Sequence, residues 1–276
     1  MRASAQAIVE EWLARQLVGF EDRRPLLVGL CGAQGSGKST VAKSLIERLA
    51  AAGIEAATLS LDDLYLTKAQ RTQLGREVHP LLTTRGVPGT HDVTLGIRTL
   101  DAIRTRQSTL LPRFDKSLDD RVPEAEWTRA PIRLQLLIFE GWCVGARPQR
   151  AADLSLPINR LEREEDADGR WRTYVNGVLA GPYQALFARL DRLILLAAPG
   201  FEVVARWRGQ QEVELRSAAP RGPGVMEEAA LQRFIEHYER LSRHILEEMP
   251  SRADLVLRLS GEREVIGIES PAAGPL

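Results

Sequence analysis

Apolar positions along the chain fall into short extended runs that alternate with segments of helical periodicity. The extended runs predict strands at 26–31, 54–61, 109–111, 132–139, 193–197 and 255–259. Apolar residues three and four positions apart predict helices at 3–17, 38–52, 93–103, 171–190, 202–216 and 225–248, the fourth bent near Gly181-Pro182. Strands that alternate with helices predict an α/β fold with a mostly parallel central sheet.

The same pattern suggests how the chain is organised. One domain is predicted over 25–260, with the helix in 1–24 packed on it and a small lid at about 200–224. Residues 66–92 lack apolar periodicity, which predicts a loop. Two further segments have no apolar pattern and are predicted to be solvated, one as a charged loop or helix start and one as a loose tail: 159–170 and 261–276.

The stretch after the first predicted strand matches the phosphate-binding pattern G-x-x-x-x-G-K-[ST]. Its glycines let backbone N–H groups turn toward a polyphosphate, and the next helix adds positive potential at its N-terminus. Lys38 is placed to reach the β- and γ-phosphates, and the Ser39 hydroxyl to ligate Mg²⁺. A glycine-rich turn alone also fits a plain β–α connection, but Lys38 and Ser39 favour a nucleotide site. The predicted nucleotide-binding residues are Gly32, Ala33, Gln34, Gly35, Ser36, Gly37, Lys38, Ser39 and Thr40.

Two acidic residues stand at the ends of other predicted strands. Asp62 follows the second strand, so its carboxylate is expected at the same sheet edge as the phosphate loop. There it is a candidate base for an acceptor hydroxyl, although Asp62 or Asp63 could instead cap a turn. Glu140 ends the strand at 132–139, as an acid beside Mg²⁺ does. We therefore predict catalytic roles for Lys38, Asp62 and Glu140, and a metal held by Ser39 and Glu140.

The composition limits the possible partners and location of the protein. The 276 residues carry 37 basic and 37 acidic side chains, and this zero net charge argues against nucleic acid or an anionic membrane as a partner. Four of the basic residues are Lys and the others are Arg. The N-terminus lacks the apolar segment of a signal peptide, and no apolar run approaches a membrane span, so a cytoplasmic protein is predicted. Cys31 and Cys143 lie beside apolar strands, which predicts buried packing.

A phosphate loop does not specify where the γ-phosphoryl group goes. The chain has no N-K-x-D motif, which argues against a GTPase. A small-molecule kinase needs a base, polar groups that hold the acceptor and a mobile cover that excludes water. Arg206 and Arg208 are candidates for the cover, or for a solvated helix face. Candidate acceptor-binding residues, each of which could also be a surface charge, are Arg85, His91, Asp92, Arg113, Asp115 and Arg121. Asp92 is also a candidate helix N-cap.

Several segments resemble a known kinase family. Residues 61–65 and 139–141 resemble the superfamily of uridine kinase, phosphoribulokinase and bacterial pantothenate kinase. More closely, the plant and fungal D-glycerate 3-kinases and their bacterial relatives are similar in the segments SLDDLYLT, RGVPGTHD, LPRFDKS, DDR, IFEGWCVG and, more loosely, LEREEDADGRWRTYVN. These segments keep the family's order and cover about half of the chain.

The resemblance implies a P-loop kinase three-layer sandwich and the reaction ATP + D-glycerate → ADP + 3-phosphoglycerate, with Mg²⁺. It implies Asp62 as the base, Glu140 as the metal-side acid, and acceptor recognition in the loops 85–92 and 113–121. An arginine pair there suits a glycerate carboxylate, because guanidinium binds carboxylates bidentately. The chain departs from the family at 117–121, where the plant-type sequences have a longer glycine-rich stretch.

The expected partners are therefore ATP and a small-molecule acceptor, with no oligomeric state predicted. Two alternatives to the glycerate reaction remain at this point. One is a kinase of another small alcohol, such as a nucleoside or a pantothenate-like compound. The other is a non-catalytic nucleotide-binding protein that regulates a partner.

Overall fold

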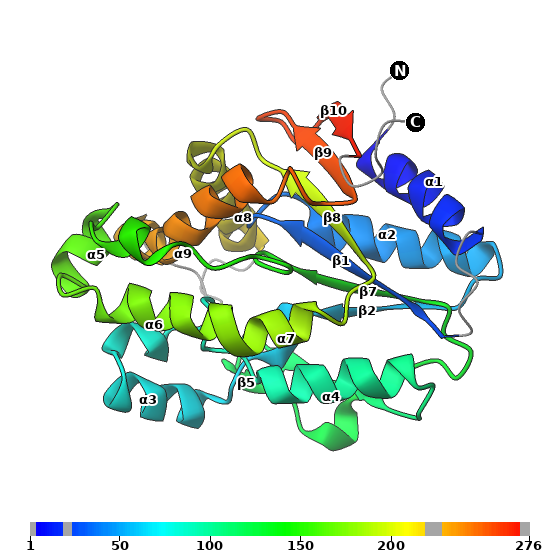
Figure 1. The fold of residues 1–276 in the computed structure, drawn as a ribbon, viewed down its shortest axis with the longest axis horizontal. Coiled ribbons are helices and arrows are strands. Elements are labelled where there is room, and N and C mark those ends of the chain that lie inside the picture. Colours follow the sequence, from blue (N-terminus) through cyan, green and yellow to red (C-terminus); the bar gives the residue numbers. More distant parts are fainter. Residues whose placement is uncertain (1–3, 19–23, 219–227, 271–276) are drawn as a thin grey trace.

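A computed structural model describes residues 4–18, 24–218 and 228–270. Its centre is a sheet with the strand order β10-β9-β8-β1-β7-β2 (Figure 1). Among the described residues, five neighbouring strands run parallel, and β10 pairs antiparallel with β9 at one edge. The mostly parallel α/β sheet predicted from the sequence is thus confirmed. The strands are β1 (Leu26–Gly32), β2 (Ala56–Ser60), β7 (Leu136–Gly141), β8 (Arg192–Ala197), β9 (Leu255–Leu259) and β10 (Val265–Glu269).

Helices cover both faces of this sheet and complete three layers (Figure 1). Side chains alternate along β1, so Val28 and Leu30 pack in one apolar cluster while Leu27 and Cys31 pack in the other. The first cluster lies against α1 (Ala5–Val18), α2 (Lys38–Ala51) and α8 (Phe201–Ala218). The second lies against α4 (Val93–Arg104), α7 (Gln184–Phe187) and α9 (Glu228–Glu248).

The helix predicted at 171–190 is built in three parts. It consists of α6 (Arg170–Val178), a π-helical turn (Leu179–Tyr183) and α7. Pro182 lies inside the π turn, where its missing N–H and bulky ring are accommodated. The irregularity falls at the Gly181-Pro182 position predicted to bend the helix.

Short elements build the loops beyond the carboxyl edge of the sheet. A 3₁₀ turn (Leu61–Leu64) follows β2 directly, and others cover Pro80–Thr83, Glu124–Glu126 and Ala151–Leu154. Two small antiparallel sheets pair β3 (Leu110–Leu111) with β6 (Thr128–Arg129), and β4 (Phe114–Asp115) with β5 (Asp120–Arg121), and the second pair is a hairpin.

Two of the segments predicted to be irregular are regular. Within the predicted loop 66–92 lies α3 (Lys68–Glu77), which begins with a reciprocal cap between Thr67 and Gln70. Within the predicted tail 261–276 lies β10, whose backbone pairs with β9. Neither element has a continuous apolar stripe, which is why the apolar pattern failed to reveal them.

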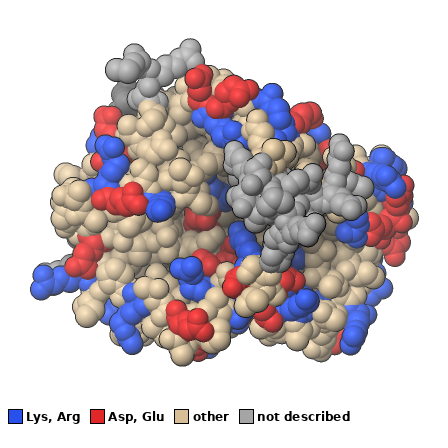
Figure 2. Space-filling model, turned by 180° about the vertical axis from the view of Figure 1, so that it is seen from behind, with Lys and Arg blue, Asp and Glu red and all other residues tan. Residues whose placement is uncertain are grey.

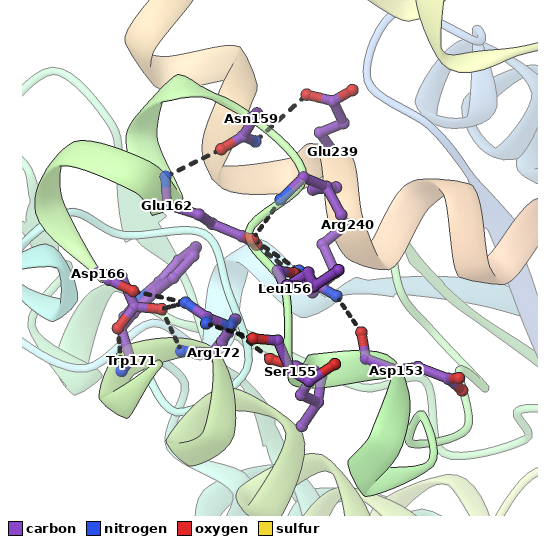
Figure 3. A network of polar contacts seen from close by, with 12 residues as sticks. Asp153, Ser155, Leu156, Asn159, Glu162, Asp166, Trp171, Arg172, Glu239 and Arg240 are labelled. Atoms are coloured by element: carbon purple, nitrogen blue, oxygen red, sulfur yellow. Dashed lines mark hydrogen bonds and ion pairs between the residues drawn. The ribbon is translucent and has the colours of Figure 1, made fainter. Parts of the chain in front are cut away.

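The charged segment 159–170 was predicted to be solvated, and this was wrong for two of its acidic residues, Glu162 and Asp166. Asn159 caps α5 (Arg160–Glu165), and Glu162 and Asp166 are buried (Figure 3). Glu162 accepts two hydrogen bonds of 2.7 Å from the guanidinium of Arg240 on α9. Asp166 pairs with Arg172 of α6 at 2.9 Å. Each buried charge therefore has an opposite partner, which offsets the cost of desolvation.

The surface agrees with the neutral composition. On the face drawn in Figure 2, basic and acidic side chains of the described residues are interspersed. None of the described helices has both the length and the apolarity needed to cross a bilayer.

Candidate active site

The loop between β1 and α2 has the geometry of a phosphate cradle. Gly35 and Gly37 have positive φ angles of 77° and 86°, which favour glycine. A Cβ on Gly32 would lie 2.7 Å from Ser36 Oγ, so the turn also needs glycine at its start. Helix α2 begins at Lys38, and its N-terminus faces the loop. The buried Ser36 Oγ and Gln34 Oε1 have no hydrogen-bond partner among the described residues.

Two residues that the sequence did not point to brace this loop from outside. Trp207 of α8 is fully buried, and a Cβ on Gly35 would lie 2.6 Å from its Cβ. Arg263, in the turn between β9 and β10, donates a 2.6 Å hydrogen bond to the Gly35 carbonyl and stacks over the Trp207 ring. The turn before β10, which falls in the segment predicted as a tail, is therefore part of the loop's support.

Glu140 ends β7 next to the loop, as the sequence predicted. It is level with Leu30 of β1 and Ser60 of β2, because these residues pair across the three strands. Its Oε1 accepts a 3.1 Å hydrogen bond from Ser39 Oγ. Its Oε2 lies 3.9 Å from Lys38 Nζ, and this buried oxygen has no hydrogen bond within the described part of the chain. One hydroxyl and one unsatisfied carboxylate oxygen form a donor set that suits Mg²⁺ shared with phosphates.

Asp62 lies just beyond β2, where both of its carboxylate oxygens are engaged. Lys116 Nζ donates to Oδ2 at 2.6 Å, and the Tyr65 hydroxyl donates to Oδ1 at 3.0 Å. Burial raises the pKa of Asp62, but the charges of Lys116 and Lys38 outweigh burial and lower the pKa from 3.8 to about 2. The carboxylate is therefore ionised at neutral pH and lies within the electrostatic reach of the phosphate-loop lysine.

Its neighbour Asp63 has a structural partner. Asp63 Oδ1 accepts a 3.1 Å hydrogen bond from the backbone N–H of Phe114, which attaches the β4–β5 hairpin to the turn after β2. The two adjacent aspartates thus face different surroundings, and only Asp62 lies beside the two lysines.

The predicted acceptor residues divide into two groups, and the first, His91 and Arg85, lies around the neighbours of Asp62, with His91 packed on Tyr65 and Arg85 bonded to the Lys116 carbonyl. His91 is buried, with its ring 4.5 Å from that of Tyr65 and its Nδ1 2.6 Å from the Tyr183 hydroxyl. Its Nε2 has no partner within the described residues. Burial lowers the pKa of His91 to about 3, so the ring is neutral. Arg85 stacks over Phe114 and forms an ion pair with Asp119.

The second group holds the loops in place. Asp92 caps α4 through a 2.9 Å hydrogen bond from the Leu95 N–H, as predicted, and its other oxygen accepts from Arg121 at 3.2 Å. Asp115 accepts hydrogen bonds from Ser117 within its own turn. Arg113 is exposed, and its charge acts on Asp63.

The two arginines predicted for the lid differ in position. Arg206 donates to the Gly261 carbonyl at 2.7 Å and lies 3.3 Å from Glu262, so it faces the turn between β9 and β10. Arg208 stacks over Phe234 of α9, and its charge acts on Tyr238. Residues 219–224 of the predicted lid lie outside the described residues, and the lid role stays a prediction.

Comparison with known proteins agrees with this geometry. No family model matches the chain. The uncharacterized kinase mug58 of Schizosaccharomyces pombe is 37% identical over 224 residues, which cover 78% of this chain and 79% of that protein. The chloroplastic D-glycerate 3-kinase of Arabidopsis thaliana is 29% identical over 262 residues, covering 89% of this chain and 55% of that protein. The solved structure of D-glycerate 3-kinase from Cryptococcus neoformans superposes with a TM-score of 0.81 at 25% identity, covering 97% of this chain and 99% of that one.

The chain belongs to the D-glycerate 3-kinase family of P-loop kinases. It is a kinase, an ATP-dependent phosphotransferase with an alcohol group as acceptor. The family resemblance predicted from SLDDLYLT, IFEGWCVG and the other segments is thus confirmed.

Sequence reasoning missed two residues that touch Asp62, namely Lys116 and Tyr65. Both lie inside segments that carried the family resemblance, yet neither had been selected. The rarity of lysine in this chain could have pointed to Lys116. Lysine occurs four times against 33 arginines, and two of the four, Lys38 and Lys116, converge on this site.

Proposed function

We propose that this kinase transfers the γ-phosphoryl group of MgATP to the 3-hydroxyl of D-glycerate and releases ADP and 3-phosphoglycerate. The observation that carries the proposal is the ionised Asp62 carboxylate, which lies within electrostatic reach of Lys38 at one edge of the sheet. The D-glycerate 3-kinases from Arabidopsis and Cryptococcus among its relatives support the choice of acceptor.

In this proposal Asp62 accepts the proton of the acceptor hydroxyl, and the resulting oxygen attacks the γ-phosphorus as the bond to ADP breaks. Lys38 and the backbone of the loop 32–40 stabilise the charge on the transferring group. Ser39 and Glu140 hold Mg²⁺, which neutralises charge on the phosphate oxygens when it is bound. The unsatisfied Oε2 of Glu140 supports this assignment.

For the acceptor, we propose Arg85 and His91 as direct contacts. The Nε2 of His91, which has no partner in the described part of the chain, offers a hydrogen bond, and Arg85 offers a guanidinium for the glycerate carboxylate. Asp92, Arg113, Asp115 and Arg121 shape the loops around them. We keep the cytoplasmic location as a prediction from the sequence.

A panel of acceptors in a coupled assay of ADP release tests the proposal. We expect D-glycerate to stimulate ADP release, and phosphorus NMR to identify 3-phosphoglycerate as the product. Uridine, pantothenate, glycerol and L-glycerate are the comparison acceptors. Faster turnover of uridine or pantothenate would assign a different acceptor. Tight ATP binding without stimulation by any compound would indicate a regulatory nucleotide-binding protein instead.

A further inference from the structure

Lys116 stands at the tip of the β4–β5 hairpin, 54 positions after the aspartate that it contacts. Its ammonium group lies 2.6 Å from Asp62 Oδ2. Partial desolvation beside the site lowers the pKa of Lys116, but the charges of Asp62 and Glu140 outweigh it and the net shift is upward. Lys116 therefore carries a full positive charge on the side of the site where Glu140 and the phosphate loop lie.

This contact conflicts with the proposed role of Asp62. A base must present one oxygen to the acceptor hydroxyl at hydrogen-bond distance. In the structure Tyr65 occupies Oδ1 and Lys116 occupies Oδ2. An acceptor hydroxyl could share either oxygen, but a carboxylate that keeps its ammonium partner is a weak base, because the charge of Lys116 helps to hold the pKa of Asp62 down. Proton transfer to Asp62 therefore becomes easier when one of these two groups moves away.

The two groups are not equally free to move. Tyr65 is 3% exposed, and its ring packs between His91 and Phe114. The Lys116 side chain is 61% exposed and has four rotatable methylene groups. Of the two partners of Asp62, Lys116 is thus the one that can move away.

Lys116 is also unnecessary for holding the hairpin. Phe114 N–H bonds to Asp63 at the base of the hairpin. Arg71 and Arg85 both pair with Asp119 on its far side. An exposed lysine added to these contacts contributes little to stability, because solvent screens it.

We propose that Lys116 is a further catalytic residue, which holds Asp62 in the free protein and moves onto an oxygen of the transferring phosphoryl group when ATP and acceptor bind. This inference rests on the proposed function of the site. The movement frees Asp62 Oδ2 for the acceptor hydroxyl and adds a second ammonium group, beside Lys38, where negative charge is transferred. No covalent bond to Lys116 forms or breaks.

The test compares Lys116→Met, Lys116→Arg and the wild-type protein. Methionine keeps the unbranched shape and most of the length of the side chain and removes its charge, whereas arginine keeps the charge. Lys43→Met is the matched control, because Lys43 is an exposed lysine on α2 outside the site. We expect Lys116→Met to lower kcat with D-glycerate by about 100-fold, the size of effect seen when one transition-state contact is removed. The ATP dissociation constant should stay within about threefold of wild type, and Lys116→Arg should recover at least tenfold of the loss.

Three results would overturn the inference. One is a kcat of Lys116→Met within threefold of wild type. Another is a loss confined to KM for D-glycerate, which would make Lys116 a ligand of the acceptor carboxylate. The third is a loss of kcat with D-glycerate but not with the uncharged glycerol, which would also make Lys116 a ligand of the acceptor carboxylate.

The experiment separates this inference from the proposed function. If the wild-type protein fails to phosphorylate D-glycerate, the acceptor assignment is wrong. The role of Lys116 is then read from slow ATP hydrolysis without an acceptor, where water takes the place of the hydroxyl. A drop of at least tenfold in Lys116→Met supports the inference there, and an unchanged rate overturns it.

Discussion

The nucleotide side of the site is one contiguous segment, residues 32–40, held between β1 and α2. The proposed acceptor side is assembled from pieces far apart in the chain, such as the contact of Lys116 with Asp62 and that of Arg85 with Asp119. The first depends on backbone conformation, and the second on ion pairs and hydrogen bonds between loops. This difference predicts that substitutions on the nucleotide side mainly weaken ATP binding, whereas substitutions behind the acceptor side mainly lower the stability of the fold.

Behind the acceptor side lies a buried network of charged side chains around Arg240 and Glu162. Breaking this network should have the largest effect on stability. Arg240 of α9 binds Glu162 and the carbonyls of Asp153 and Leu156 (Figure 3). Tyr238, two positions before Arg240 on α9, packs on Trp142. The buried network thus fixes the helix that lies against the acceptor loops.

We expect Glu162→Ala to lower the free energy of unfolding by about 3–5 kcal/mol, because it leaves the Arg240 guanidinium buried without its partner. Urea denaturation measures this loss. The control is Glu164→Ala on the same helix, whose exposed pair with Arg160 should contribute about 0.5 kcal/mol or less. Equal effects of the two substitutions would show that burial does not govern the contribution of these pairs.

On the nucleotide side, ATP binding should depend most on the backbone conformation of the phosphate loop. Gly35→Ala should raise the ATP dissociation constant by about 10- to 100-fold, which corresponds to about 1–3 kcal/mol of strain at a positive φ against Trp207. Calorimetric titration with ATP measures it. Gly53→Ala is the control, since Gly53 has a φ of 76° but open space around it at the end of α2. A Gly35→Ala protein that binds ATP like wild type would contradict the shape argument.

Per pH unit, the smallest predicted effect is a dependence of stability on pH from the acceptor side. Burial lowers the pKa of His91 to about 3, against 6.5 in the unfolded chain. Between these values the unfolded chain binds a proton that the folded protein does not, so stability is lost as pH falls from 6.5 toward 3. The slope from one such group is at most about 1.4 kcal/mol per pH unit.

We expect His91→Asn to flatten this slope in urea denaturation between pH 6.5 and 4. His237 of α9 has a pKa lowered to about 4 by burial, so His237→Asn should flatten the same curve at its upper end. Unchanged slopes in both proteins would mean that neither ring is held neutral by the fold.

The fold and the nucleotide side could be read from the sequence because their signals are local. Apolar runs marked the parallel strands, and one motif marked the phosphate loop with Lys38 and Ser39. The ends of adjacent parallel strands meet at one edge, so Asp62 and Glu140 were correctly expected beside that loop.

The rest depends on contacts between residues distant in the sequence. Helix α3 buries Arg71 against Asp119, 48 positions away, and has no apolar stripe. β10 is a five-residue edge strand whose isoleucines stay exposed. From the sequence, Glu162 cannot be distinguished from an exposed glutamate, because its buried partner Arg240 lies 78 positions away.

The central claim is that the two sides meet at Asp62, which acts on the acceptor while Lys38 acts on ATP. The most direct measurement determines kcat with D-glycerate and the ATP dissociation constant for Asp62→Asn and Lys38→Ala together. We predict that Asp62→Asn lowers kcat by about 10²- to 10⁴-fold with ATP affinity nearly unchanged. Lys38→Ala should impair both. An Asp62→Asn protein that turns over at the wild-type rate, or that loses ATP affinity as much as Lys38→Ala does, would contradict the account.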